Sequence, residues 1–119
     1  MTQPHPTITP ADLERVVRRD FPAERVDEVF AMLNEYGGED WHSEPERVRA
    51  AALKLAAGSI EELRGHIECA KMDYRDVLAP AEYPGYTKYW FRINKLPADE
   101  VQRIIDADWT QYQDWLTRP

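Results

Sequence analysis

The sequence predicts an all-α protein: a compact single domain of about six or seven helices with a central antiparallel helical hairpin. Apolar residues recur every three or four positions, and Ser, Thr and Pro start signals and Gly stop signals bound these runs. Only one stretch would suit a β-strand, and no second run exists to pair with it. The 119 residues suit one domain. We expect a flexible N-terminal tail at residues 1–8 and a single helical domain at residues 9–119.

Two helices are expected before residue 37. Thr9 can cap the first, because Pro10 then occupies the first helical position, where its missing N–H costs nothing. Asp20 is predicted to cap the second, since the ring of Pro22 fits only a first turn. Gly37-Gly38 ends that second run. Its apolar residues at helical spacing are Val26, Val29, Phe30, Leu33 and Tyr36.

The central hairpin is predicted from two capping boxes. Ser43 to Glu46 opens a helix whose body, from Val48 to Ala57, is apolar on nearly all sides. Gly58 closes it, and Ser59 to Glu62 opens the next helix at once, so the two helices are expected to be antiparallel neighbours. The residues expected to face inward from the second of them are Leu63, Ile67 and Ala70.

The C-terminal third is the most aromatic part of the chain. Asp73 to Asp76 resembles a capped start, and Pro80 is predicted to end that short helix. The stretch from Tyr83 to Ile93 is predicted to be helical, and Pro97 to Glu100 opens the last helix. Aromatic and aliphatic residues at core-like spacings in this third are Trp90, Trp109, Tyr112 and Leu116.

Composition excludes several classes. The single cysteine, Cys69, cannot form an internal disulfide, so a secreted disulfide scaffold is excluded. No apolar run is long enough for a membrane span, and the stretch from Met1 to Pro10 lacks the pattern of a signal peptide, so we expect a cytoplasmic protein without a membrane partner. The net charge of −7 disfavours nucleic acid as a partner. The segment from Glu24 to Glu46 concentrates this acidity, with eight carboxylates against Arg25 alone.

Short segments spread from about Tyr36 to the C-terminus carry a resemblance. They are Tyr36-Gly37, Trp41-His42, Glu46-Arg47-Val48, Leu53-Lys54-Leu55, Asp73-Tyr74-Arg75-Asp76-Val77-Leu78, Ala81-Glu82-Tyr83-Pro84 and Gln111-Tyr112-Gln113-Asp114-Trp115-Leu116. In these segments the chain resembles a group of small uncharacterised bacterial proteins with no known activity. The resemblance implies a compact bacterial domain and transfers no catalytic residue.

Two clusters of residues could carry chemistry. One is a metal-ligand set for a small metal-assisted hydrolase, although carboxylates in a first helical turn are more often structural. Its members are Glu39, Asp40, His42, Glu44 and Glu46. The other is an acid–base set, for which a capped helix start is the more common explanation. Its members are Asp73, Asp76, Glu82, Tyr74 and Tyr83. Cys69 has no basic neighbour in sequence and is interpreted as a small buried hydrophobe.

The favoured hypothesis is a non-catalytic acidic helical protein-interaction module without cofactors, which could neutralise a basic partner as bacterial immunity proteins do. Two surfaces are expected to bind protein. The acidic one comprises Glu35, Glu39, Asp40 and Glu44, and the aromatic one comprises Tyr83, Tyr86, Lys88, Tyr89 and Arg92. The alternatives are the metal-assisted hydrolase and a structural homodimer joined through the aromatic segment.

Overall fold

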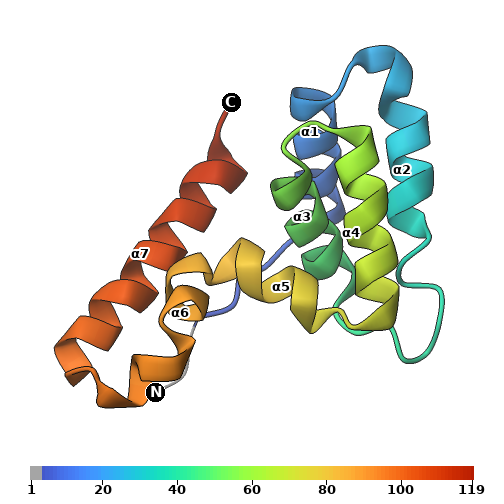
Figure 1. Cartoon of the computed structure of the whole chain (residues 1–119). Coiled ribbons are helices and arrows are strands. Elements are labelled where there is room, and N and C mark those ends of the chain that lie inside the picture. The colour runs from blue at the N-terminus through green and yellow to red at the C-terminus, as the bar shows by residue number, and fades with distance from the viewer. Residues whose placement is uncertain (1–3) are drawn as a thin grey trace.

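A computed structural model describes residues 4–119 and confirms an all-α single domain (Figure 1). No strand occurs in this part of the chain. The helices are α1 (Pro10–Asp20), the 3-10 helix η1 (Ala23–Arg25), α2 (Val26–Asn34), α3 (Pro45–Ala56), α4 (Ile60–Met72), α5 (Arg75–Glu82), α6 (Pro84–Lys88), the 3-10 helix η2 (Trp90–Lys95) and α7 (Ala98–Thr117). We call α1–α5 the body, and α6 with η2 the corner.

The predicted central hairpin is confirmed. Helices α3 and α4 pack closely against each other, and α1 and α2 lie alongside them (Figure 1). The α3 residues Ala50, Ala51 and Ala52 are all buried, and their small side chains let neighbouring helices approach on several sides. The expected inward residues Leu63, Ile67 and Ala70 of α4 are buried as well.

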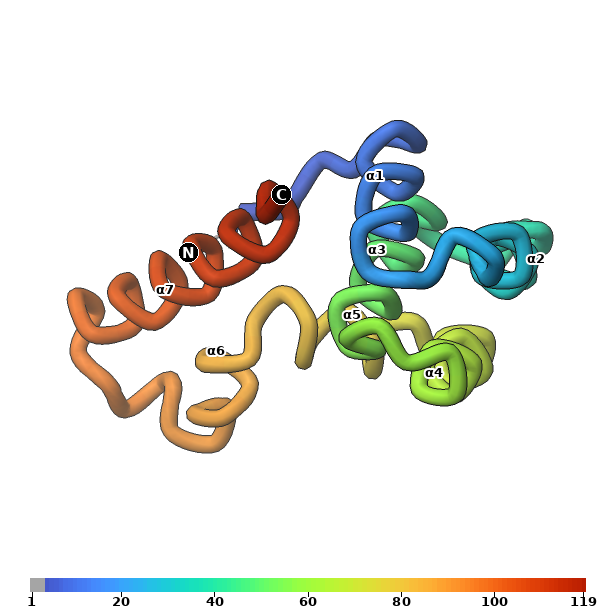
Figure 2. The backbone as a smooth tube through the Cα atoms, turned by 90° about the horizontal axis from the view of Figure 1, so that it is seen from above, coloured from blue at the N-terminus to red at the C-terminus, as the bar shows by residue number. Residues whose placement is uncertain are grey.

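Helix α7 lies apart from the four-helix bundle for most of its length, with α5 and α6 between them (Figures 1 and 2). Only its C-terminal half joins the main core, through Tyr112, Trp115 and Leu116. Arg15 donates to the carbonyl of Leu116 at 2.7 Å, and Arg19 donates to that of Trp115 at 2.8 Å. The molecule is therefore elongated, 48 × 32 × 23 Å.

Two of the predicted helix starts are confirmed. Thr9 caps α1 in a reciprocal capping box with Asp12, and Pro10 occupies the first position. Ser59 caps α4 by accepting the backbone N–H of Glu62 at 3.2 Å. Both starts depend only on side chains within one helical turn, so they can be predicted from the sequence.

Two other predicted starts are wrong. Ser43 does not cap α3, because Glu44 precedes the helix in a left-handed conformation (φ 51°) without any side-chain cap. Asp20 does not cap the second helix, because it ends α1 and its carboxylate binds the guanidinium of Arg19 at 2.7 Å. The turn η1 after Pro22 instead leads into α2.

The predicted end of the fifth helix is also wrong. Pro80 lies inside α5, which continues to Glu82. A proline removes the hydrogen bond to the carbonyl four positions earlier and crowds that carbonyl. Here the carbonyl belongs to Asp76, in the first turn of α5, where the residue is exposed.

Residues 1–3 of the predicted tail lie outside the described residues. Within the rest of that segment, Pro6 is buried. The imidazole Nδ1 of His5 lies 3.2 Å from the hydroxyl of Tyr83.

Candidate interaction surfaces

The predicted helix from Tyr83 to Ile93 is divided at Tyr89, where α6 ends and the 3-10 helix η2 begins. A 3-10 helix has 3.0 residues per turn in place of 3.6, so the direction of each following side chain changes. Trp90, predicted to be in the core, is 62% exposed, and its neighbour Phe91 is 89% exposed. Trp109 is also partly exposed.

Three cations lie close to these two exposed rings in sequence. Lys88, Arg92 and Lys95 are exposed, and none forms an ion pair within residues 4–119. The Lys88 ammonium lies 5.7 Å and the Arg92 guanidinium carbon 5.4 Å from the centre of the Tyr89 ring. We call Lys88, Trp90, Phe91, Arg92 and Lys95 the basic–aromatic surface.

A buried carboxylate on α7 holds this corner in place. Asp108 accepts the backbone N–H groups of Gly85 at 2.8 Å and Tyr86 at 2.9 Å, at the start of α6. A β-carbon at Gly85 would lie 2.8 Å from the Asp108 Oδ1, so only glycine fits there without a shift. The corner buries Ile93, which lies outside the main core together with Ile105 of α7.

The three tyrosines that were predicted for this surface are less exposed than expected. Tyr83, Tyr86 and Tyr89 are all partly buried. Trp90, Phe91 and Lys95 were missed, since apolar spacing assumed one continuous helix. A usable signal was nevertheless present, because the chain from Tyr83 to Ala98 carries no acidic residue in a protein of net charge −7.

Tyr83 belongs to a buried network between α3 and α5. The Arg47 guanidinium donates to both carboxylate oxygens of Glu82, at 2.6 and 2.7 Å, and to the Tyr83 hydroxyl at 2.7 Å. Burial, together with the Glu82 charge, raises the pKa of Tyr83 to about 12. Burial disfavours the charged form of Arg47 and acts to lower its pKa. The bonds to Glu82 and its charge outweigh this effect, so the pKa of Arg47 is raised. Glu82 is therefore fully engaged in a structural pair.

The acid–base set is not brought together. Asp73 lies at the opposite end of α5 from Glu82, where it binds the Arg75 guanidinium at 2.9 Å and accepts its backbone N–H at 3.0 Å. Hydrogen bonds from Arg75 lower the pKa of Asp73. Asp76 is exposed in the first turn of the same helix. Asp73 thus binds a backbone N–H at the start of α5, although the residue that precedes this helix, Tyr74, forms no side-chain cap.

The second predicted surface forms around the connection between α2 and α3. Glu39, Asp40 and Glu44 are exposed and have no ion pair in the described part of the chain. Trp41 directly follows Asp40 in the sequence and is 59% exposed. We call residues 37–44 the acidic loop. Glu35 lies just outside it and already binds Lys71 at 2.8 Å, which lowers the pKa of Glu35.

Side chains inside the acidic loop fix its shape. The Tyr36 hydroxyl donates to the carbonyl of Ser43 at 2.8 Å, which joins the two ends of the loop. The Nδ1 atom of His42 accepts the backbone N–H groups of Gly37 at 2.8 Å and Glu39 at 3.3 Å. The His42 ring stacks on Tyr36 with centroids 4.4 Å apart. These bonds leave Trp41 and the carboxylates facing outward.

The metal-ligand set does not converge in the described residues. No group of three or more His, Cys, Asp and Glu side chains there could hold a metal ion. The Nδ1 atom of His42 is occupied by backbone donors. Cys69 is half-buried, and burial raises the pKa of its thiol. The metal-assisted hydrolase stays a prediction without a geometric observation to favour it.

A cavity of about 660 Å³ lies where the C-terminal ends of α1, α3 and α7 meet. Lys54 lines it, and burial lowers the pKa of this lysine. Arg19 lines it too, but its guanidinium is occupied by Asp20 and by carbonyls at the end of α7. Helix C-terminal ends carry partial negative charge, which these cations help to balance.

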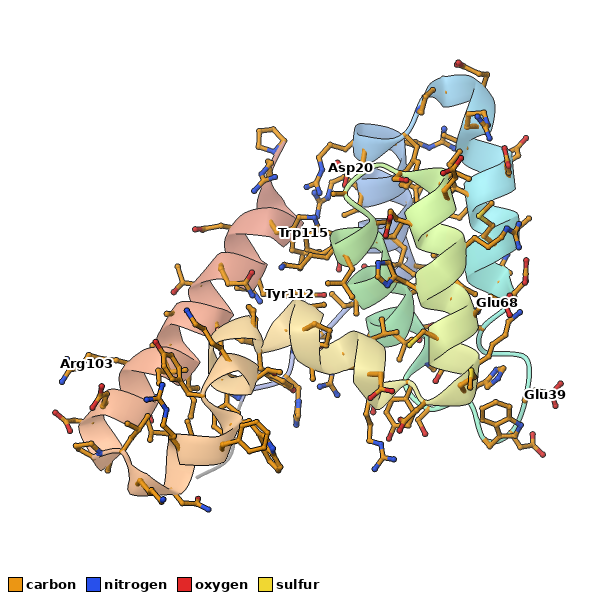
Figure 3. All side chains as sticks on the ribbon, viewed as in Figure 1. Asp20, Glu39, Glu68, Arg103, Tyr112 and Trp115 are labelled. Carbon is orange, nitrogen blue, oxygen red and sulfur yellow. The ribbon has the colours of Figure 1, made fainter. Side chains whose placement is uncertain are left out.

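The two surfaces lie far apart along the molecule. The acidic loop is at the end formed by α2 and α3, and the corner is at the end where α7 begins (Figure 1). Glu39 and Arg103 are near these opposite ends (Figure 3). The folded molecule therefore carries an acidic surface at one end and a basic, aromatic surface at the other.

Comparisons with protein-family models, curated proteins and solved structures find no match to this chain. The resemblance to small bacterial proteins stays a prediction. No helix among the described residues is both long and apolar enough to cross a membrane. The surfaces and their chemistry therefore have to carry the functional interpretation.

Proposed function

We propose that the protein is a non-catalytic helical interaction module that binds a partner protein on the basic–aromatic surface. The observation that carries this proposal is the exposure of Trp90 and Phe91 among three cations that have no ion pairs within residues 4–119. Aromatic residues and arginine dominate the binding energy of protein interfaces. Contiguous exposed apolar side chains with a polar rim are typical of docking sites.

The charges of this surface favour a partner that is acidic at the point of contact. Nucleic acid would also present negative charge, but the remainder of the chain is strongly acidic, with a net charge of −7 overall. That charge repels a phosphate backbone, whose binding depends on an excess of cations along a broad face. A protein surface with local carboxylates meets only the corner and avoids this repulsion.

Capture followed by a measured affinity tests the proposal. A partner captured from lysate by the immobilised chain is purified, and its dissociation constant is measured by calorimetry. The double variant Trp90→Ser/Phe91→Ser is expected to weaken binding at least about tenfold, because exposed anchors at interfaces each contribute more than 1 kcal/mol. Met72→Ser is the matched control, since Met72 is 88% exposed on α4 and outside the surface. Equal affinity of all three proteins would contradict the proposal.

A second candidate function, neutralisation of a basic partner, is supported by the acidic loop. Trp41 offers an exposed ring, and Glu39, Asp40 and Glu44 offer unpaired carboxylates around it within the described structure. This combination suits the side chain of lysine or arginine, which binds both aromatic faces and carboxylates.

A short peptide rich in arginine tests this second function. The variant Glu39→Gln/Asp40→Asn/Glu44→Gln is expected to bind it more weakly than the wild type, and binding should fade from low to high salt. Glu24→Gln/Asp27→Asn serves as the control, because those carboxylates are exposed at the other end of α2. If neither salt nor the loop substitutions change the affinity for the peptide, the acidic loop does not bind it and this second function is wrong.

A further inference from the structure

We propose that the acidic loop of one copy docks on the basic–aromatic surface of a second copy, so that the protein associates head to tail. This inference rests on the proposed function and names its partner. The two surfaces are complementary in charge, in aromatic content and in position.

The charges match in number and differ in sign. The acidic loop presents three carboxylates, on Glu39, Asp40 and Glu44, and the basic–aromatic surface presents three cations, on Lys88, Arg92 and Lys95. Neither set forms an ion pair inside residues 4–119. Each surface therefore supplies the partner charges that the other lacks, which favours encounter and register between them.

Each surface also exposes large aromatic rings. Trp41 of the loop and Trp90 and Phe91 of the corner are three of the five large apolar side chains exposed in the described structure. A contact between the two surfaces would cover all three rings and place the Trp41 ring beside Lys88 and Arg92. Cations bind well over an indole face, so this arrangement joins apolar burial with charge pairing.

The position of the surfaces requires a second molecule. They lie at opposite ends of an elongated chain whose longest dimension is 48 Å (Figures 1 and 3). One copy cannot bring them together. Because the two patches differ, the contact is heterologous, and a pair of bound copies keeps one free acidic loop and one free basic–aromatic surface. A symmetric dimer through the aromatic segment would instead place like charges face to face.

Neighbouring charges do not cancel this complementarity. Asp99, near the corner, binds Arg103 at 3.0 Å, and Lys71, near the loop, is paired with Glu35 and Glu68. Glu100, next to Asp99, is an exposed carboxylate for which the described residues provide no ion pair. The overall repulsion between two copies of charge −7 is screened at physiological salt, where the Debye length is about 8 Å, whereas the contact charges interact at shorter range.

Sedimentation equilibrium of the purified full chain tests the inference with two charge-reversed variants. The wild type is expected to exceed its monomer mass of 13.9 kDa as concentration rises. Each of two triple variants should associate at least about tenfold more weakly, because each then carries two ends of like charge. One variant is Lys88→Glu/Arg92→Glu/Lys95→Glu, and the other is Glu39→Lys/Asp40→Lys/Glu44→Lys. An equimolar mixture of the two variants should associate again, since acidic ends now meet basic ends.

Glu24→Lys/Asp27→Lys is the matched control, as it reverses exposed charge outside both surfaces and should associate like the wild type or more strongly because of its lower net charge. Unchanged far-ultraviolet circular dichroism shows that the variants fold. A wild type that stays monomeric, or a mixture of reversed variants that does not associate, overturns the inference. The proposed function survives that result if Trp90→Ser/Phe91→Ser still loses a captured partner, and both fail if it does not.

Discussion

The body buries most of its large apolar side chains, whereas the corner exposes two aromatic ones. Leu33, Leu53 and Leu63 of the body are fully buried between α2, α3 and α4, while Trp90 and Phe91 of the corner point into solvent. The difference follows from helix length. Helices α3 and α4 have 12 and 13 residues and can present long apolar faces, but α6 has 5 and η2 has 6. The apolar side chains that stabilise the fold and those that are proposed to bind a partner thus lie in separate segments.

The largest expected effect comes from breaking the buried ion pair where the body meets the corner. Glu82→Ala leaves the Arg47 charge buried without its partner, which costs about 3–5 kcal/mol of unfolding free energy. Urea denaturation measures this loss. The control is Glu28→Ala, because the Arg25–Glu28 pair has the same 2.6 Å separation but is exposed. Equal stability losses in both variants would show that burial does not distinguish the two pairs.

A pair of truncations sharpens the comparison between the two regions directly. Leu53→Ala opens a cavity in the fully buried centre of α3 and is expected to cost about 2–5 kcal/mol. Phe91→Ala removes a larger side chain but should change stability by no more than about 0.5 kcal/mol, since its ring is already in water. The same denaturation experiment measures both. A large loss from Phe91→Ala would mean that the corner belongs to the core.

Breaking the hydrogen bonds between the corner and α7 should cost less stability than a cavity in the core, and the effect should be local. Asp108→Ala removes the acceptor for the Gly85 and Tyr86 amides and should cost about 1.5–3 kcal/mol, the usual range for hydrogen bonds to a charged group. Hydrogen exchange at these two amides should become faster, while exchange in α3 and α4 should change less. Exchange that rises equally in all helices would indicate that body and corner unfold together.

The smallest effect is a dependence on alkaline pH. The folded protein holds the Tyr83 proton more tightly than the unfolded chain does, since its pKa is about 12 against 10.0 for a free tyrosine. Unfolding is therefore favoured as pH rises from 10 towards 12, by about 1 kcal/mol at pH 11. Tyr83→Phe should have a shallower loss of stability over this range. Burial also raises the pKa of Tyr112, so some loss remains in the variant.

The parts of the fold that depend on local chemistry could be predicted from the sequence. Thr9 and Ser59 start helices because their hydroxyls bond within one turn, and Leu63, Ile67 and Ala70 face the core because their helix is regular. The prediction for Ser43 was wrong because the residue that directly precedes α3 is Glu44, in a left-handed conformation that local spacing does not reveal.

The candidate surfaces were predictable in charge but not in detail. The acidic loop follows from a run of carboxylates that have few cations near them in sequence. Trp90 was placed in the core, because nothing in local spacing shows that the helix changes its period after Tyr89. The sequence also does not show that Asp108, far along the chain, binds the start of α6.

The bonds that join the ends of the acidic loop have a consequence for the speed of recognition. Tyr36 and His42 hold the backbone on either side of Trp41 before any partner arrives, so little chain entropy remains to be lost on contact. If the loop binds as proposed, its association is expected to be limited by diffusion and orientation and to need no slow rearrangement. Tyr36→Phe would free the loop, and the resulting slower capture would distinguish a preorganised handle from an adaptable one.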